Sequence, residues 1–76
     1  MDIQKFDVSI TRHAFLRAIE RKVTPDMVEA TIKGGTQRVF GKAFISLSKQ
    51  YKHFTVVCIG EIVGNTIIIK TVETKQ

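Results

Sequence analysis

Three residues of one short segment, His13, Arg17 and Arg21, have side chains that could bind and cleave a phosphodiester. They recur at steps of four, so a helix would place them about one turn apart on one face. Two arginines can hold phosphate oxygens through paired donors, and a histidine beside them can transfer a proton near neutral pH. The alternative is an ordinary solvated helix face, on which Glu20 forms an ion pair with a neighbouring basic side chain. The residue types alone leave both interpretations open.

Three further residues, Tyr51, His53 and Lys70, are candidates in the second half of the chain. Tyr51 and His53 alternate, so a strand would point both to the same face, where they could stack a base or transfer protons. The alternative, which we favour, is a partly exposed strand face or a turn. Lys70 interrupts the apolar sequence IIIKTV and must reach solvent, pair with a carboxylate or serve a site. Reaching solvent at a sheet edge is the favoured interpretation.

No pattern in the sequence indicates a metal or a cofactor. Two histidines and one cysteine do not form a recognisable set of metal ligands. The pair Gly34-Gly35 is better explained as the end of a helix than as a phosphate-binding loop. Cys58 lies among valines and isoleucines, which favours a buried, unreactive thiol. We therefore predict chemistry or binding without a metal or cofactor.

Two helices are expected between residues 11 and 33. The first begins at Thr11, whose hydroxyl can cap free backbone N–H groups. Its apolar residues Phe15, Leu16 and Ile19 share one face, with Ala18 at the edge, and the basic triplet lies on the opposite face. We expect the three large apolar side chains to anchor this helix in the core.

The second helix carries the clearest local signals. Thr24 is a good N-cap and Pro25 fits the first helical position. Gly34-Gly35 ends the helix, with a glycine free to adopt the left-handed conformation. The expected buried stripe is Met27, Val28, Thr31 and Ile32.

The rest of the chain is predicted to be β-structure, with strands at residues 36–40, 43–48, 51–63 and 65–74. Turns are expected at Gly41-Lys42, Lys49-Gln50 and Gly64-Asn65, and Gly60 is expected to mark a bulge. Three consecutive isoleucines in the last strand predict burial on both faces, or on one face and at an interface. The fold class is α+β, a single domain of residues 1–76 with two N-terminal helices packed on a four-stranded antiparallel meander.

Composition limits the class of protein. The 76 residues allow one small core, and the net charge of +5 suits a polyanionic partner, although many small proteins are basic. No apolar run is long enough to cross a membrane, and MDIQKFDVSI does not resemble a signal peptide. With a single cysteine, we expect the protein to be cytoplasmic.

The segment HAFLRAIERKVTPDMVEATIKGG resembles the start of a widespread family of small prokaryotic domains of unknown function. Members read His-Ala-x-x-Arg-x-x-x-Arg, then an aliphatic residue, a Ser or Thr, and an acidic helix ending in Gly. The matching positions here are His13, Ala14, Arg17, Arg21, Val23, Thr24, Val28 and Gly34. The Thr71-Val72 pair in the last strand also fits. The family often has Gly after the second arginine, where this chain has Lys22, so we expect the first helix to end differently.

This family is similar in layout to the RelE/ParE/BrnT toxin group, which comprises small basic proteins with helices ahead of an antiparallel meander. Many members of that group cleave RNA without a metal, so the resemblance implies a RelE-like ribonuclease toxin or a non-catalytic relative. In the ribonuclease hypothesis the 2′-hydroxyl attacks phosphorus and His13 or His53 takes its proton. The two arginines stabilise the phosphorane, and Tyr51 or Lys70 assists the leaving oxygen.

The candidate catalytic residues are His13, Arg17, Arg21, Tyr51 and His53, and the candidate nucleic-acid contacts are Arg12, Lys22, Arg38 and Lys70. The alternative hypothesis is a non-catalytic module that binds nucleic acid, or inhibits a protein, through the same basic face. The expected partners are RNA, or DNA instead, and a protein such as an antitoxin. The isoleucine-rich strand is a candidate homodimer interface.

Overall fold

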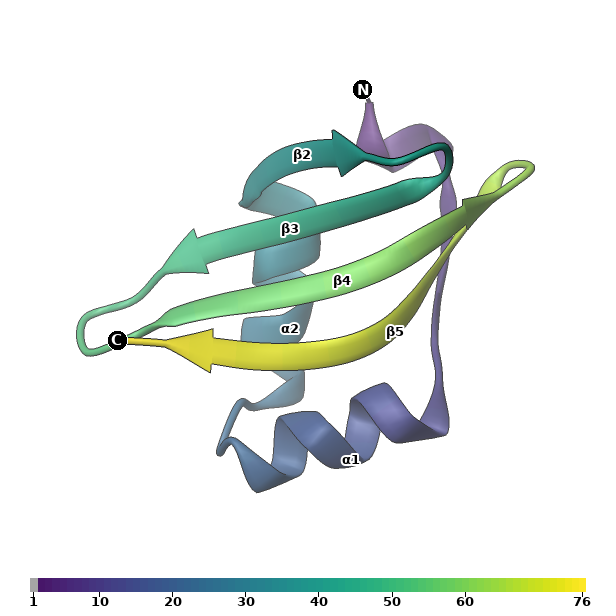
Figure 1. Ribbon diagram of the computed structural model, residues 1–76. Helices are drawn as coiled ribbons and strands as arrows, with labels where there is room; N and C mark the ends of the chain where they lie inside the picture. The colour runs from purple at the N-terminus through teal and green to yellow at the C-terminus, as the bar shows by residue number, and fades with distance from the viewer. Residues whose placement is uncertain (1) are drawn as a thin grey trace.

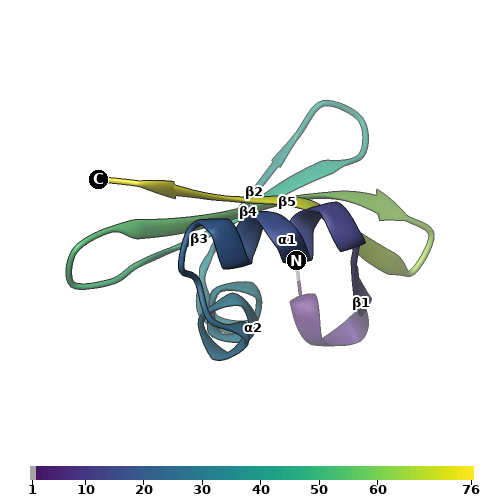
Figure 2. The same cartoon turned by 90° about the horizontal axis from the view of Figure 1, so that it is seen from below.

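Five strands form one mixed sheet, one face of which is covered by a helix (Figure 1). The computed structural model describes residues 2–76. Its elements are η1 (Ile3–Lys5), β1 (Asp7–Ile10), α1 (Arg12–Glu20), α2 (Pro25–Gly34), β2 (Thr36–Phe40), β3 (Phe44–Gln50), β4 (Thr55–Val63) and β5 (Thr66–Lys75). The strand order is β1-β5-β4-β3-β2. Seen from below, α2 lies under the sheet, whereas α1 runs along its β5 edge (Figure 2).

The α+β class and the antiparallel meander β2–β5 are confirmed, but the prediction of four strands is wrong. A fifth strand, β1, precedes the helices and pairs parallel to β5, from Asp7 opposite Thr66 to Ile10 opposite Ile69. All four of its side chains are exposed, so it lacks the alternation of buried and exposed residues that identifies a strand. Its partner strand is also distant in the sequence, and no local signal specifies that pairing.

The prediction for the buried face of α1 is also wrong. Ala14 and Ala18 are the buried residues of this helix, whereas Phe15, Leu16 and Ile19 are 51%, 46% and 56% exposed. Small side chains allow the helix backbone to approach β5 closely. The start of the helix is as expected, because the Thr11 hydroxyl accepts a hydrogen bond from the backbone N–H of Ala14.

The second helix agrees with its prediction except at the end. Thr24 caps α2, and of the expected buried stripe Val28, Thr31 and Ile32 are buried whereas Met27 is half-buried. No glycine there is left-handed: Gly34 belongs to the helix, and Gly35 follows in an extended conformation. Gly35 is required by space instead, because a Cβ atom there would lie 2.5 Å from the backbone oxygen of Ser48. Helix α2 and strand β3 therefore meet backbone to backbone.

Within the meander, the turns at Gly41 and Gly64 are confirmed, and both glycines have positive φ. The turn expected at Lys49-Gln50 is wrong, because β3 continues to Gln50. The chain reverses over residues 51–54, where the Tyr51 N–H donates to the Phe54 carbonyl at 2.7 Å. Strand β4 consequently begins at Thr55 rather than at Tyr51.

The expected bulge lies at Gly60, where the register of β4 with β5 shifts and Lys70 becomes the unpaired residue. A Cβ atom on Gly60 would lie 2.7 Å from the carbonyl oxygen of Ile68, which explains the glycine. In the isoleucine run, Ile67 and Ile69 are fully buried and Ile68 is half-buried on the other face.

The core lies between the sheet and the helices. Its fully buried members from the sheet are Ile45, Leu47, Val56, Cys58, Ile67, Ile69 and Val72. Burial raises the pKa of the Cys58 thiol to about 11, as expected for an unreactive cysteine. In residues 2–76, neither α-helix has the length and apolar character that crossing a bilayer would need.

Candidate functional site

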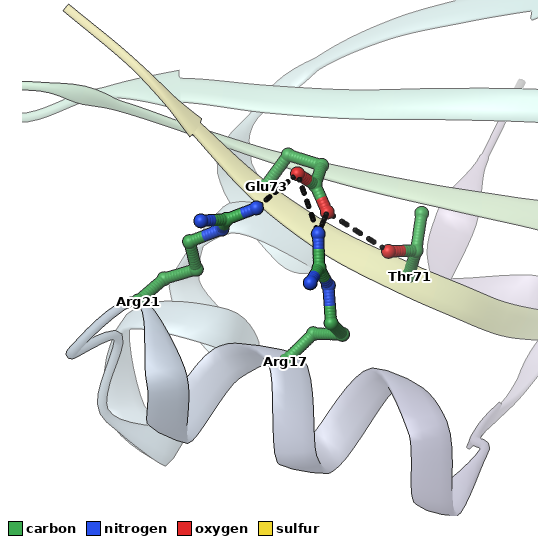
Figure 3. Close-up of polar contacts among 4 residues, drawn as sticks. All are labelled: Arg17, Arg21, Thr71 and Glu73. Atoms are coloured by element: carbon green, nitrogen blue, oxygen red, sulfur yellow. Dashed lines mark hydrogen bonds and ion pairs between the residues drawn. The ribbon is translucent and has the colours of Figure 1, made fainter.

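Arg17 of α1 and Arg21, the residue that follows this helix, meet a carboxylate of β5 that no sequence pattern singled out. Nη2 of Arg17 lies 2.9 and 3.2 Å from the two carboxylate oxygens of Glu73, and Nη2 of Arg21 lies 2.9 Å from one of them. The Thr71 hydroxyl donates to the same carboxylate at 3.1 Å. Figure 3 shows both guanidinium groups reaching from α1 to Glu73. The basic face of the helix is thus directed at the sheet.

The topology explains this contact. Strand β1 ends at Ile10, opposite Ile69, so the rest of β5 has no strand on its outer side, and α1 lies there instead. Thr71 and Glu73 alternate with the buried Val72, so both side chains project away from the core. They are placed where the arginines of α1 can reach them.

Two guanidinium groups facing one carboxylate leave an excess of positive charge. The hydrogen bond from Arg17 is the main cause that lowers the pKa of Glu73, and Arg21 and Thr71 add to it, while partial desolvation opposes them. The Nε atom of Arg17 is buried and has no hydrogen-bond partner among residues 2–76, although the side chain as a whole is 31% exposed. The Arg21 side chain is 37% exposed and remains accessible to a ligand.

A shallow hollow of about 240 Å³ opens beside this cluster. Its lining residues Thr74 and Gln76 belong to the end of the sheet that is marked C in Figure 1. Three segments line it: the α1–α2 connection, the β3–β4 turn and the end of β5. The lining residues are Arg21, Lys22, His53, Phe54, Thr74 and Gln76. We call this surface the basic hollow. It brings together Arg21 and His53, two of the predicted catalytic residues, with Lys22, a predicted nucleic-acid contact.

Lys22 reaches the basic hollow from a left-handed backbone conformation, with a φ of 60°. The Lys22 N–H donates to the Ile19 carbonyl at 3.0 Å, and the Val23 N–H donates to the Ala18 carbonyl at 2.8 Å. These two bonds form a Schellman motif with Lys22 at the position usually occupied by glycine. A side chain there costs about 1–2 kcal/mol. The expectation that the helix ends differently because of Lys22 is therefore wrong: it ends as a glycine-capped helix would, but with an ammonium group at the hollow.

The remaining predicted catalytic residues do not line the basic hollow. His13 lies exposed on the first turn of α1, toward the opposite end of the helix. The Tyr51 hydroxyl donates to the carbonyl of Met27 at 3.1 Å and lies 3.3 Å from the hydroxyl of Thr31. These contacts give Tyr51 a structural role between the β3–β4 turn and α2.

Three predicted nucleic-acid contacts lie elsewhere on the surface. Arg12 begins α1, Arg38 lies exposed on the outer strand β2, and Lys70 is the bulged residue of β5. The Lys70 ammonium lies 2.9 Å from a carboxylate oxygen of Glu61, so this lysine both reaches solvent and pairs with an acid. None of the three extends the basic hollow.

Sequence reasoning missed Glu73 and Phe54, and it named Thr71 without placing it at a site. The alternation of Thr71, Val72 and Glu73 could have placed the first and last on one face of a strand. Nothing local, however, pairs that face with a helix more than 50 residues earlier. Phe54 was assigned to a strand, whereas it belongs to a turn and stacks on Tyr51 with ring centroids 6.0 Å apart.

A larger apolar hollow of about 520 Å³ lies between η1, β1 and the two helices. Exposed Phe15 and Ile19 of α1 contribute to it, and the charged residues on its lining, Glu29 and Lys33, pair with each other at 2.7 Å. In the part of the chain that the structure describes, no group of three His, Cys, Asp or Glu residues could hold a metal. The basic hollow is thus the place where chemistry-bearing side chains converge.

Comparisons with protein-family models, with curated proteins and with solved structures give no match to this chain.

Proposed function

We propose that the protein binds single-stranded RNA at the basic hollow. The observation that carries this proposal is the convergence of Arg21, Lys22 and His53, from two distant segments, on one concave surface. Arginine and lysine neutralise backbone phosphates, and this electrostatic contact supplies most of the sequence-independent affinity for nucleic acid. The predicted preference for RNA over DNA and the RelE-like assignment are part of this proposal.

Charge at this end of the molecule supports the proposal. Its basic residues come from α1 and the segment that follows, from the β3–β4 turn and from the end of β5: Arg17, Arg21, Lys22, Lys52 and Lys75. The acidic side chains of the same segments are Glu20 and Glu73, so positive charge is in excess. A concave surface with one sign of charge concentrates an oppositely charged polymer.

The rings of His53 and Phe54 beside the basic groups favour single-stranded over double-stranded RNA. His53 is exposed at the hollow, and Phe54 is held in place by stacking on Tyr51. Bases of single-stranded RNA stack on such rings, whereas those of a duplex already stack on each other. The same hollow can therefore take a phosphate and an adjacent base.

Lysine in a left-handed position adds an independent argument. Glycine would end α1 in the same geometry without the steric cost, so the strain at Lys22 brings no structural benefit. Residues kept in costly conformations cluster at functional sites. We attribute the cost to the ammonium group that Lys22 places at the hollow.

RNA cleavage is a second candidate function, favoured by the shared position of His53 and Arg21. His53 would take the proton of the 2′-hydroxyl while the 2′ oxygen bonds to phosphorus. Arg21 would stabilise the charged phosphorane, and the bond to the 5′ oxygen would break as water protonates that oxygen. The products would be a 2′,3′-cyclic phosphate and a 5′-hydroxyl.

The test measures fluorescence anisotropy of a short labelled single-stranded RNA over a range of salt concentrations. We expect binding that weakens steeply with salt. Lys22→Ala should lower the affinity several-fold and reduce the salt slope by about 0.7, the value for one phosphate contact to a single strand. The matched control is Lys42→Ala, which removes the same charge in the distant β2–β3 turn and should have a smaller effect. No binding at low salt, or equal losses in both variants, would refute the proposal.

Cleavage is tested separately on the same RNA by gel electrophoresis. The ribonuclease hypothesis requires cyclic-phosphate products with the parent protein and none with His53→Ala. Intact RNA with the parent protein would leave binding as the function and exclude cleavage of that RNA.

A further inference from the structure

An acidic side chain lies beside the basic hollow and contacts Arg21, one of its lining residues. The carboxylate of Glu73 accepts hydrogen bonds from Arg17, Arg21 and Thr71, at distances between 2.9 and 3.2 Å. Guanidinium and hydroxyl groups bind phosphate in the same manner. We infer that Glu73 is a built-in competitor for RNA phosphate, which occupies both arginines until a phosphate displaces its carboxylate. This inference rests on the proposed function.

Arg21 connects the carboxylate to the hollow. Its guanidinium is within 2.9 Å of Glu73, and its side chain also lines the basic hollow. A phosphate bound in the hollow and the Glu73 carboxylate would therefore compete for the donors of one side chain. A phosphate that binds Arg21 would therefore weaken the hydrogen bond between Arg21 and Glu73.

The ion pairs of Glu73 are easily opened. The side chains of Arg17, Arg21 and Glu73 are 31%, 37% and 33% exposed, and ion pairs this close to solvent contribute little to stability. The outer side of β5 carries no strand at Glu73, so its side chain can swing toward solvent without breaking sheet pairing. A polymer with several phosphates can replace this single carboxylate.

The opposite role for Glu73 would be to orient the arginines for the ligand. The structure favours competition, because two guanidinium groups meet a single carboxylate and all three side chains are about one-third exposed. A phosphate can therefore approach the donors that Glu73 occupies. The two roles predict opposite results: removal of a competitor raises the affinity for RNA, whereas removal of a positioning residue lowers it.

The experiment compares the parent protein with Glu73→Gln, Glu73→Asp and the control Glu20→Gln in the RNA-binding assay. Glu20 is exposed on the last turn of α1 and its side chain makes no hydrogen bond or ion pair among residues 2–76, so its replacement makes the same charge change without freeing the arginines. We expect Glu73→Gln to bind up to about fivefold more tightly than the parent, with a salt slope steeper by about 0.7 for each additional phosphate that the freed arginines bind. Glu20→Gln should produce a clearly smaller gain in affinity.

Glu73→Asp separates competition from net charge. It keeps the negative charge but shortens the side chain by one methylene, so it should release the arginines and also raise the affinity. If Glu73→Gln fails to give a cooperative melting transition, Glu73→Asp carries the test. Affinity at or below the parent value in the folded Glu73 variants would overturn the inference and leave RNA binding standing. If only the Glu73 variants bind RNA, the inference that Glu73 competes with phosphate is supported. If neither the parent protein nor any variant binds RNA, the proposed function itself is refuted.

Discussion

Nη2 of Arg17 lies 2.9 Å from a carboxylate oxygen of Glu73, although 56 residues separate the two in the sequence. This contact joins the exposed side of α1 to the outer strand segment that β1 leaves uncovered. The apolar attachment of the same helix depends on Ala14 and Ala18, which are small. Because the ion pair is partly exposed, it adds little to the stability of this attachment.

The pH dependence of stability should reveal this ion pair. The pKa of Glu73 is lowered in the folded protein from an ordinary value of 4.5, so the folded state binds its proton less tightly than the unfolded state. The stabilising contribution is complete above that ordinary value and is lost as the pH falls through the lowered pKa. Urea unfolding of the parent and of Glu73→Gln should differ by about 1 kcal/mol or less near neutral pH and converge in acid.

The comparison needs its own control, because other carboxylates also titrate in this range. Hydrogen bonding to Lys33 lowers the pKa of Glu29, for example. Subtracting the two curves cancels such groups, since both proteins contain them. A difference that stayed constant from neutral to strongly acidic pH would show that the carboxylate charge is not what Arg17 and Arg21 recognise.

Replacing Lys22 should separate stability from binding. Lys22→Gly removes the left-handed strain of about 1–2 kcal/mol but loses about 0.5–1 kcal/mol through the freedom of glycine in the unfolded chain. We expect a net gain of up to about 1.5 kcal/mol in the free energy of unfolding. Lys22→Ala keeps the Cβ atom and its strain, so its stability should remain near that of the parent.

Both Lys22 variants lack the ammonium group and should therefore lose RNA affinity equally. Chemical denaturation and the anisotropy assay on the same samples provide the two measurements. Full RNA affinity in the more stable glycine variant would mean that the strained lysine has no part in binding.

The parts of the fold that local chemistry determines could be predicted from the sequence. The caps at Thr11 and Thr24 bond to an N–H three residues away, and the turn at Gly64 depends on one positive φ. These features need no knowledge of the tertiary structure. The bulge at Gly60 belongs with them, because an isolated glycine in a strand pattern indicates one.

Features that depend on distant contacts could not be predicted. A helical wheel shows which side chains share a face, and the face with the largest apolar side chains, including Phe15 and Ile19, is the one expected to be buried. Strand β5, however, accepts only the alanine face against its backbone, and the large side chains remain exposed. The candidate site also has a predictable and an unpredictable part. The spacing of the arginines identifies them as candidates, whereas Glu73 is identified only by the contact between β5 and α1.

Tyr51→Phe tests whether this tyrosine is structural. The variant loses a hydroxyl that donates to the Met27 carbonyl and contacts the Thr31 hydroxyl, but keeps the ring stacked on Phe54. We expect a loss of about 1 kcal/mol in the free energy of unfolding, typical of one hydrogen bond, with RNA affinity unchanged. A loss of RNA cleavage or binding without a change in stability would instead return Tyr51 to the functional site.

Adjacent glycines at the end of α2 provide a matched pair of substitutions. In Gly35→Ala the new Cβ atom would lie 2.5 Å from the Ser48 backbone oxygen and also meet the Thr31 carbonyl oxygen. Neither backbone can move without separating α2 from β3, so we expect a loss of about 1–3 kcal/mol, the range for overpacking. In Gly34→Ala the nearest atom is Nζ of Lys49 at 3.8 Å, which is ordinary contact, and alanine favours the helix by up to about 1 kcal/mol.

The two alanine variants add the same methyl group at neighbouring positions, so differences in composition cancel. Thermal and urea unfolding should show Gly34→Ala at or above the parent in stability and Gly35→Ala clearly below it. Equal stability of the two variants would contradict the close backbone approach of α2 and β3. Because the basic hollow lies at the other end of α2, RNA affinity should be unchanged in both proteins as long as they are folded.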